Sequence, residues 1–358
     1  MEKVVHNYVP ANGINIHIAE LGSGPAVLLL HGFPEIWYSW RHQLVGLAEA
    51  GFHAIALDFR GYGLTHNTDP SKNDWLDCVD DVIGVLDALH LDKVYVVAKD
   101  WGAFVAYHLG YAHSERILGL AVFGIPFFNP TSSSAIFERL PAGHYLMRWA
   151  VPGVPEADFR RFDVATVIKR IYILFCNREM PIAADNENTL DLVKSSDSLP
   201  DWMSEKDLQV YAELYENSGF GHPMEVPYRC FQRAAAKLAN CQNFTIPVPL
   251  LLVIGDQDYA VRIDGLEQRL MGVPDHGRCM LFNSWRYAFP ADFYGEALQA
   301  YVHGAASGVE GIAASDMHAY RAKYPVSIYE TSERRSLLTY HGKAPQIDVF
   351  IFCSLRKD

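Results

Sequence analysis

The sequence has no apolar stretch long enough to cross a bilayer. A membrane-spanning helix needs about 20 mostly apolar residues, and the longest runs here, residues 26–30 and 249–254, are only of strand length. The N-terminus also has no basic region followed by an apolar run, so we expect no secretory signal. These absences favour a cytoplasmic protein without a membrane partner.

The sequence also has fewer positively than negatively charged residues. The chain of 358 residues has 30 Lys and Arg against 42 Asp and Glu, a net charge of −12 with His neutral. Such a balance opposes phosphate backbones and anionic lipid surfaces, so nucleic acid is a poor partner. The 6 cysteines are scattered without a C-x-x-C pair, which is typical of reduced, mostly buried thiols rather than disulfides or a metal site.

Short apolar runs alternate with longer segments that have the length and period of helices. The runs predict strands that are buried on both faces: residues 26–31, 53–58, 94–98, 118–124 and 248–255. The intervening helical segments cover residues 40–50, 75–89 and 103–113. This alternation predicts an α/β fold, with a mostly parallel sheet and flanking helices.

The rhythm changes after residue 130, where the chain becomes rich in Pro, Tyr, Trp and Phe. Short helices are predicted there at residues 158–174, 190–195 and 204–218. An insertion between two strands of a parallel sheet, at their carboxyl ends, would cover the ligand crevice. We therefore predict a helical lid over residues 131–244 and a core formed by residues 1–130 and 245–358.

The last quarter of the chain fits this pattern less well. Residues 270–343 are atypical, and residues 304–343 have little apolar surface to bury, so we expect them to pack poorly against the core. Residues 347–353, IDVFIFC, predict one more strand.

A carboxylate occupies the most informative turn of the sequence. Asp100 follows a buried strand and precedes a helix, with the small residues Ala98 and Gly102 two positions before and after it. This is the pattern of a nucleophile elbow, in which the reactive residue has unfavourable backbone angles. An Asp could instead simply cap the helix. As a nucleophile it needs no base, because its pKa is near 4, and it would attack a strained or activated alkyl carbon.

The turn after an early strand carries the sequence His31, Gly32, Phe33 and Pro34. In this kind of fold such a turn supplies one backbone donor of an oxyanion hole. We expect the donors to be the N–H groups of Phe33 and Trp101. The alternative is an ordinary turn between a strand and a helix. Arg60, in the D-F-R-G-Y-G run at residues 58–63, is interpreted as structural.

These motifs together resemble plant soluble epoxide hydrolases of the α/β-hydrolase superfamily. The similarity rests on HGFP at 31–34, D-F-R-G-Y-G at 58–63, K-D-W-G at 99–102 and G-I-P-F at 124–127, and it covers roughly residues 1–265. It implies an α/β-hydrolase fold with a helical lid, and hydrolysis of epoxides to vicinal diols through an Asp ester without a cofactor.

The same resemblance implies several site residues. Two lid tyrosines of the family donate hydrogen bonds to the epoxide oxygen, and the matching positions are Tyr145 and Tyr228, among the 19 tyrosines of the chain. The turn and the elbow would contribute His31, Pro34 and Trp101 to substrate binding.

The acid that orients a catalytic histidine is expected after the strand at residues 248–255. Asp258 matches the family's acid, and Asp256 is the alternative. The family's G-x-x-H-F-like loop is not found. The remaining candidates for the histidine are His276, His303, His318 and His341, each of which more closely fits a surface histidine.

Residues 345–352 resemble the family's final strand, but the chain ends where the histidine loop would begin. We infer that residues 270–340, or part of them, are foreign to the family pattern, as a retained intron or a misassembled gene would make them.

Three functions are consistent with these residues. The first is a cofactor-independent epoxide hydrolase whose turnover is impaired by the missing histidine. The second is a haloalkane-type dehalogenase, which would need halide-binding donors such as the indole N–H of Trp101. The third is a degenerate hydrolase that only binds a small apolar ligand. In each case we expect a small-molecule partner and a monomer or homodimer.

Overall fold

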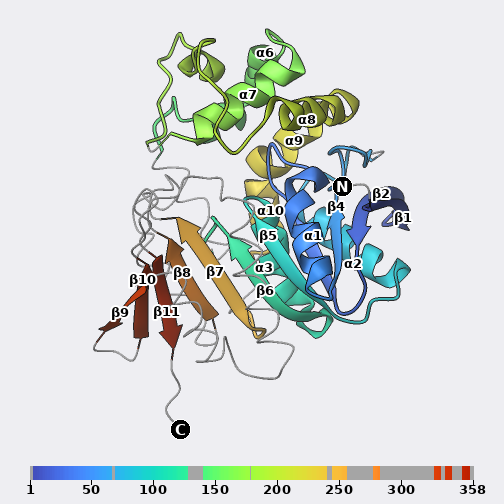
Figure 1. Cartoon of the computed structure of the whole chain (residues 1–358). Coiled ribbons are helices and arrows are strands. Elements are labelled where there is room, and N and C mark those ends of the chain that lie inside the picture. The colour runs from blue at the N-terminus through green and yellow to red at the C-terminus, as the bar shows by residue number, and fades with distance from the viewer. Residues whose placement is uncertain are drawn as a thin grey trace.

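The computed structural model describes residues 3–66, 69–127, 140–177, 179–239 and 244–255, together with four later strands. The strands form one sheet with the order β1-β2-β4-β3-β5-β6-β7-β8-β11-β10-β9 (Figure 1). The bounds of the strands are β1 Val5–Ala11, β2 Ile14–Leu21, β3 Ala26–Leu30, β4 His53–Leu57, β5 Val94–Lys99, β6 Ile117–Phe123, β7 Leu250–Gly255, β8 Gly277–Phe282, β9 Val326–Thr331, β10 Arg335–Tyr340 and β11 Val349–Ser354.

The centre of the sheet is parallel. Strands β4, β3, β5, β6, β7 and β8 pair with one another in parallel. Every residue of β3 is buried, which explains its unbroken apolar run, because a parallel strand is covered on both faces. The five predicted apolar runs correspond to β3, β4, β5, β6 and β7. The predicted fold class is therefore confirmed.

The two edges of the sheet are antiparallel. Strands β1 and β2 form a hairpin, and β2 pairs with β4. Most residues of β1 are exposed, so its apolar periodicity is weak, and the sequence did not predict it.

The far edge of the sheet changes the interpretation of the C-terminal region. The predicted strand at residues 347–353 exists as β11, but it runs antiparallel to β8, whereas β8 itself is the parallel neighbour of β7. In the sheet, the run that resembles the family's final strand therefore lies one position beyond β8, on the side away from β7. Strands β9 and β10 fall within residues 304–343, and the rest of that range lies outside the described residues.

Helices flank the sheet close to where the sequence predicted them. Helix α1 packs against β4, α3 packs against β5 and β6, and α2 packs against α3 and β1. The bounds of the helices before β6 are η1 Trp37–Trp40, α1 Arg41–Glu49, α2 Trp75–Ala88, α3 Gly102–Ala112 and η2 Ser114–Arg116. Arg60 is structural as interpreted, since its Nε lies 2.6 Å from Oδ2 of Asp81 on α2, and both side chains are buried.

The segment between β6 and β7 is helical, and we call its helices the inserted helices. Their bounds are α5 Tyr145–Trp149, α6 Val154–Phe159, α7 Val164–Phe175, η4 Thr189–Leu192, α8 Glu205–Ser218, α9 Gly221–Met224, η5 Glu225–Arg229 and α10 Phe231–Lys237. Figure 1 shows α6, α7, α8 and α9 gathered at one end of the sheet. The ring of Tyr228 on η5 lies 5.6 Å from that of Trp101, so this is the end where β5 leads into α3.

One helix of the inserted segment was predicted wrongly. The sequence predicted a single helix over residues 158–174, but α6 ends at Phe159 and α7 begins at Val164. The break occurs because the Asp163 carboxylate accepts a hydrogen bond from the Thr166 N–H at 2.8 Å and so caps a new helix.

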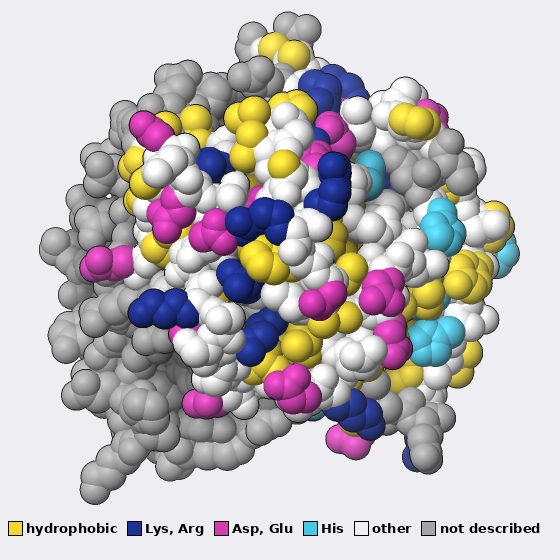
Figure 2. All heavy atoms as spheres, turned by 90° about the horizontal axis from the view of Figure 1, so that it is seen from above, with side chains coloured by type: hydrophobic (Ala, Val, Ile, Leu, Met, Phe, Trp, Pro, Cys, Tyr) yellow, Lys and Arg dark blue, Asp and Glu magenta, His cyan; other side chains and the backbone are white. Residues whose placement is uncertain are grey.

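The face of the molecule formed by the inserted helices carries side chains of both charges. Figure 2 shows Lys and Arg interspersed with Asp and Glu over the described part of this face. The helices within the described ranges are all too short or too polar to span a membrane.

Candidate active site

The turn between β5 and α3 has the geometry of a nucleophile elbow. Asp100 has φ of +50°, the left-handed region, as predicted for the reactive residue. Its N–H donates to the Phe123 carbonyl at 3.3 Å, and its carbonyl accepts from the Ala103 N–H at 3.0 Å. The strained residue is therefore fixed between the strand beside it and the helix that follows.

Glycines allow this elbow to touch the turn after β3. A Cβ on Gly102 would lie 2.5 Å from the carbonyl oxygen of His31. A Cβ on Gly32 would lie 2.1 Å from Oδ1 of Asp100. The predicted need for small residues is thus a real steric limit, and it extends to Gly32.

This contact places a backbone donor against the carboxylate. The Phe33 N–H donates to Oδ1 of Asp100 at 2.8 Å. This hydrogen bond orients one oxygen of the carboxylate. The carboxylate needs no deprotonation to act as a nucleophile. The second expected donor, the N–H of Trp101, directly follows Asp100 in the chain.

An ion pair beside the elbow was not predicted from the sequence. The Lys99 ammonium pairs with the Glu35 carboxylate, whose residue is only 4% exposed. The same carboxylate accepts the Gly32 N–H at 3.0 Å. Glu35 follows the HGFP motif and Lys99 precedes Asp100, so both residues stand next to recognisable motifs. That they pair with each other depends on the tertiary structure.

The two predicted tyrosines meet over this region. The rings of Tyr145 and Tyr228 lie 6.2 Å apart and nearly perpendicular, and both residues are buried. Burial raises the pKa of Tyr228 well above 10, and the nearby Tyr145 and Asp100 raise it further, whereas a hydrogen bond with Trp101 lowers it. Tyr228 is therefore a protonated donor at neutral pH.

Trp149 is a further site residue that the sequence did not predict. Its ring lies 5.0 Å from Tyr145, 5.2 Å from Tyr228 and 5.9 Å from Phe33. The indole is fully buried, and its N–H has no hydrogen-bond partner among the described residues. An apolar helix position gives no sequence signal for such a role.

Both ring nitrogens of His31 are hydrogen-bonded to the backbone. Its Nδ1–H donates to the Gly32 carbonyl at 2.8 Å, and its Nε2 accepts the Phe59 N–H at 3.1 Å. Burial lowers the pKa of His31, which keeps the ring neutral. Both nitrogens are occupied by the backbone, so His31 fixes the turn and offers a substrate only its ring carbons.

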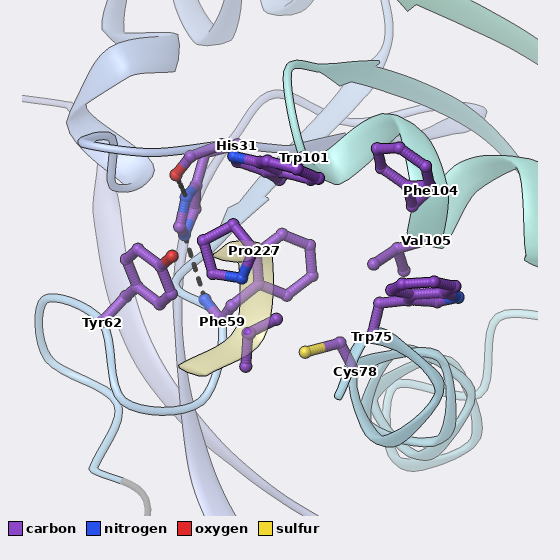
Figure 3. Close-up of a pocket in the computed structure, with 11 residues that line it drawn as sticks. His31, Phe59, Tyr62, Trp75, Cys78, Trp101, Phe104, Val105 and Pro227 are labelled. Carbon is purple, nitrogen blue, oxygen red and sulfur yellow. Dashed lines mark hydrogen bonds between the residues drawn. The ribbon is translucent and has the colours of Figure 1, made fainter. Parts of the chain in front are cut away.

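A small apolar cavity lies beside the elbow (Figure 3). Its volume is about 20 Å³, room for roughly one water molecule. The His31 ring and Gly32 border it from the turn, Trp101 from the elbow, and Pro227 from η5. Trp75 and Cys78 of α2 also form part of the wall, and burial raises the pKa of the Cys78 thiol well above its usual range.

Pro34 lies in the same turn as Phe33. Its carbonyl accepts a hydrogen bond from the Tyr172 hydroxyl of α7 at 3.1 Å. The backbone of Pro34 thus connects the core to the inserted helices.

Several predicted residues fall outside the described part of the chain. These are Asp258, Asp256 and the candidate histidines His276, His303, His318 and His341. Within the described ranges, Cys78, Cys176 and Cys230 form no disulfide bond, and no group of His, Cys, Asp and Glu side chains is arranged to hold a metal.

Comparison with known proteins agrees with this geometry. Residues 25–269 match the family model of the alpha/beta hydrolase fold. Epoxide hydrolase 2 of Siraitia grosvenorii is 35% identical over 278 residues, which are 76% of this chain and 87% of that protein. Epoxide hydrolase 3 of the same plant is 36% identical over 274 residues, 75% of this chain and 85% of that protein.

Solved structures point the same way. A laboratory-evolved variant of potato epoxide hydrolase superposes with a TM-score of 0.75 at 30% identity, covering 84% of this chain and 98% of that one. An epoxide hydrolase from Vigna radiata superposes with a TM-score of 0.73 at 30% identity, covering 84% and 95%. With an Asp at its elbow and a fold that matches theirs, the chain belongs to the plant-type epoxide hydrolases of the α/β-hydrolase family.

Proposed function

We propose that the protein opens epoxides through an ester on Asp100. The observation that carries the proposal is the Asp100 carboxylate, which is held at a left-handed elbow by the Phe33 N–H, together with two buried tyrosines beside it. The aromatic side chains around Asp100 favour a small apolar epoxide as the substrate. We also propose that the inserted helices act as a lid over this site.

The first chemical step uses only described residues. The oxygen of the Asp100 carboxylate that does not accept the Phe33 N–H attacks a ring carbon, and the bond from that carbon to the epoxide oxygen breaks. The alkoxide then takes a proton from Tyr228 or Tyr145, so that a neutral hydroxy ester forms. The high pKa of Tyr228 keeps its proton available at neutral pH.

The second step is hydrolysis of the ester. Water attacks the ester carbonyl, and negative charge develops on the oxygen that accepts the Phe33 N–H. Trp101 would supply the second backbone donor. The step needs a base that activates the water and an acid that orients this base. Asp258 remains our candidate for the acid. Because no well-placed histidine is found in the sequence, we propose that ester hydrolysis is slow and limits turnover.

The test is product formation from a terminal aryl epoxide. We expect conversion to the vicinal diol, its loss in Asp100→Asn, and a fall of about 10²–10⁴-fold in the rate of ring opening when both Tyr145 and Tyr228 become Phe. Ring opening at an unchanged rate in that double variant would overturn the roles of the tyrosines. A location in the cytoplasm and a monomeric or homodimeric state are further proposals, which fractionation and size-exclusion chromatography test.

A haloalkane-type dehalogenase is kept as a second candidate because of one observation. The Trp149 indole N–H is buried in the site wall without a partner among the described residues, and such a group could bind a halide. Against it, the Trp101 side chain is engaged in a hydrogen bond with Tyr228. Halide release from a primary alkyl bromide, lost in Trp149→Phe, would favour this candidate over the epoxide hydrolase.

A further inference from the structure

We propose that Tyr172 and Tyr215 of the inserted helices are positioning residues that hold the Phe33 N–H against Asp100. The inference deepens the proposed function and rests on it. Neither tyrosine touches the reacting atoms, and each acts through the backbone of residues 32–35, which we call the oxyanion turn.

The oxyanion turn is attached to the core at its beginning. The Gly32 N–H donates to a carboxylate oxygen of Glu35 at 3.0 Å, and the Glu35 N–H donates to the Gly32 carbonyl at 3.3 Å. The other oxygen of the Glu35 carboxylate pairs with Lys99, the residue before Asp100. These bonds fix Gly32 and the Glu35 side chain relative to the elbow.

The two carbonyls that follow Phe33 are bound by the inserted helices. The Tyr172 hydroxyl on α7 donates to the Pro34 carbonyl at 3.1 Å. The Tyr215 hydroxyl on α8 donates to the Glu35 carbonyl at 3.3 Å. Tyr172 and Tyr215 are at most 2% exposed, so water cannot readily replace either hydroxyl.

The Phe33 side chain is enclosed from the same direction. The rings of Trp149, Tyr215 and Tyr228 meet it edge to face, with centroids at 5.9, 6.4 and 5.5 Å. Tyr215 therefore contacts the turn twice, through its hydroxyl on the backbone and through its ring on Phe33.

This attachment matters because of what the Phe33 N–H does. It lies 2.8 Å from Oδ1 of Asp100, the oxygen that becomes negative when water attacks the ester. A donor in an oxyanion hole is effective only when it is already in place, and a misplacement of about 1 Å can cost roughly 10²-fold in rate. If the carbonyls of the turn lose their partners, we expect the turn to relax and the donor to move.

The experiment compares Tyr172→Phe, Tyr215→Phe and the double variant with the wild type. The matched control is Tyr38→Phe, which removes a hydroxyl from the same interface between core and inserted helices. The Tyr38 hydroxyl donates to Asp207 of α8 at 2.9 Å and does not bind the oxyanion turn. Single-turnover kinetics with a terminal aryl epoxide then gives the rate of ester formation and of ester loss.

In the double variant we expect ester loss to slow by about 10- to 100-fold, ester formation to slow less, and KM to stay within about 2-fold. Amide hydrogen exchange of the peptide containing Gly32 and Phe33 should become roughly 10-fold faster in the double variant. Both effects should be absent in Tyr38→Phe.

Exchange of that peptide and loss of the ester at rates equal to those of Tyr38→Phe would overturn the inference. If the wild type forms neither ester nor diol, the proposed function fails, and the exchange measurement still decides whether the tyrosines position the turn. Faster exchange confined to the Tyr172 and Tyr215 variants supports the positioning role in that case, and equal exchange refutes it.

Discussion

A single methyl group at position 32 tests how closely the oxyanion turn approaches the elbow. The Cβ of Gly32→Ala would lie 2.1 Å from Oδ1 of Asp100, so either the carboxylate or the turn must shift. We expect a loss of roughly 10²-fold in kcat/KM for an epoxide, together with about 1–3 kcal/mol of stability. Steady-state kinetics and urea unfolding measure the two effects.

The control is Gly221→Ala, which adds the same methyl group at the start of α9 with nothing within 4 Å. It should leave activity unchanged. Equal activities of the two variants would mean that the carboxylate does not depend on the close approach of Gly32.

The pKa of Tyr228 predicts how ring opening depends on pH. Because its pKa is raised well above 10, the hydroxyl keeps its proton beyond the pH at which an exposed tyrosine ionises. We expect the rate of ester formation to stay level between pH 8 and about 10. A stopped-flow profile that falls with an apparent pKa near 9 would show that Tyr228 is not the donor.

Some site residues could be predicted from the sequence and some could not. Asp100 was identifiable because the small residues around an elbow are close neighbours in the chain. Tyr145 and Tyr228 came from family resemblance alone, since a buried tyrosine has no distinctive local pattern. The pair of Glu35 and Lys99, like the contacts of Trp149, joins segments that are distant in the chain, so no local pattern reveals it.

The Asp74 carboxylate stabilises two helices, α2 and α10, by contacting both. Its carboxylate caps α2 by accepting the N–H groups of Leu76 at 2.9 Å and Asp77 at 3.3 Å. It also pairs with Lys237 of α10 at 2.5 Å. We expect Asp74→Ala to lower the free energy of unfolding by about 1–2 kcal/mol, mostly through loss of the cap.

Chemical denaturation of Lys237→Met separates the two contributions. That side chain is half exposed, so its pair with Asp74 should contribute less than about 1 kcal/mol. A loss in Lys237→Met as large as that in Asp74→Ala would contradict the assignment to the cap.

Elements were predictable where the local pattern and the tertiary environment agree. The central strands are apolar on both sides because they are covered on both faces, so β3 to β7 were found. Strand β1 is mostly exposed and lacks that pattern. At Asp163 the opposite error occurred, and one helix was predicted where there are two. The apolar period of the sequence continues across this residue, but its side chain caps a new helix.

The stability of the whole molecule should fall as the solution becomes acidic. Burial is the main cause that lowers the pKa of His108, His144 and His222 to about 4. Between the ordinary pKa near 6.5 and about 4, the unfolded chain binds protons that the folded chain does not. Each of these histidines should therefore lower the free energy of unfolding by up to about 1.4 kcal/mol per pH unit in that range.

Urea unfolding at pH 7, 6 and 5 measures this slope. His108→Gln should make the slope shallower by up to about 1.4 kcal/mol per pH unit. A stability independent of pH between 7 and 5 would contradict the prediction.

The proposed chemistry depends on a covalent ester between Asp100 and an epoxide. Intact-mass measurement after incubation with a terminal aryl epoxide tests it most directly. We expect a gain of one epoxide mass on the peptide that contains Asp100, and this ester should accumulate because its hydrolysis is slow. Asp100→Asn should gain nothing. An unchanged mass without diol, or an adduct that persists in Asp100→Asn, would contradict the claim.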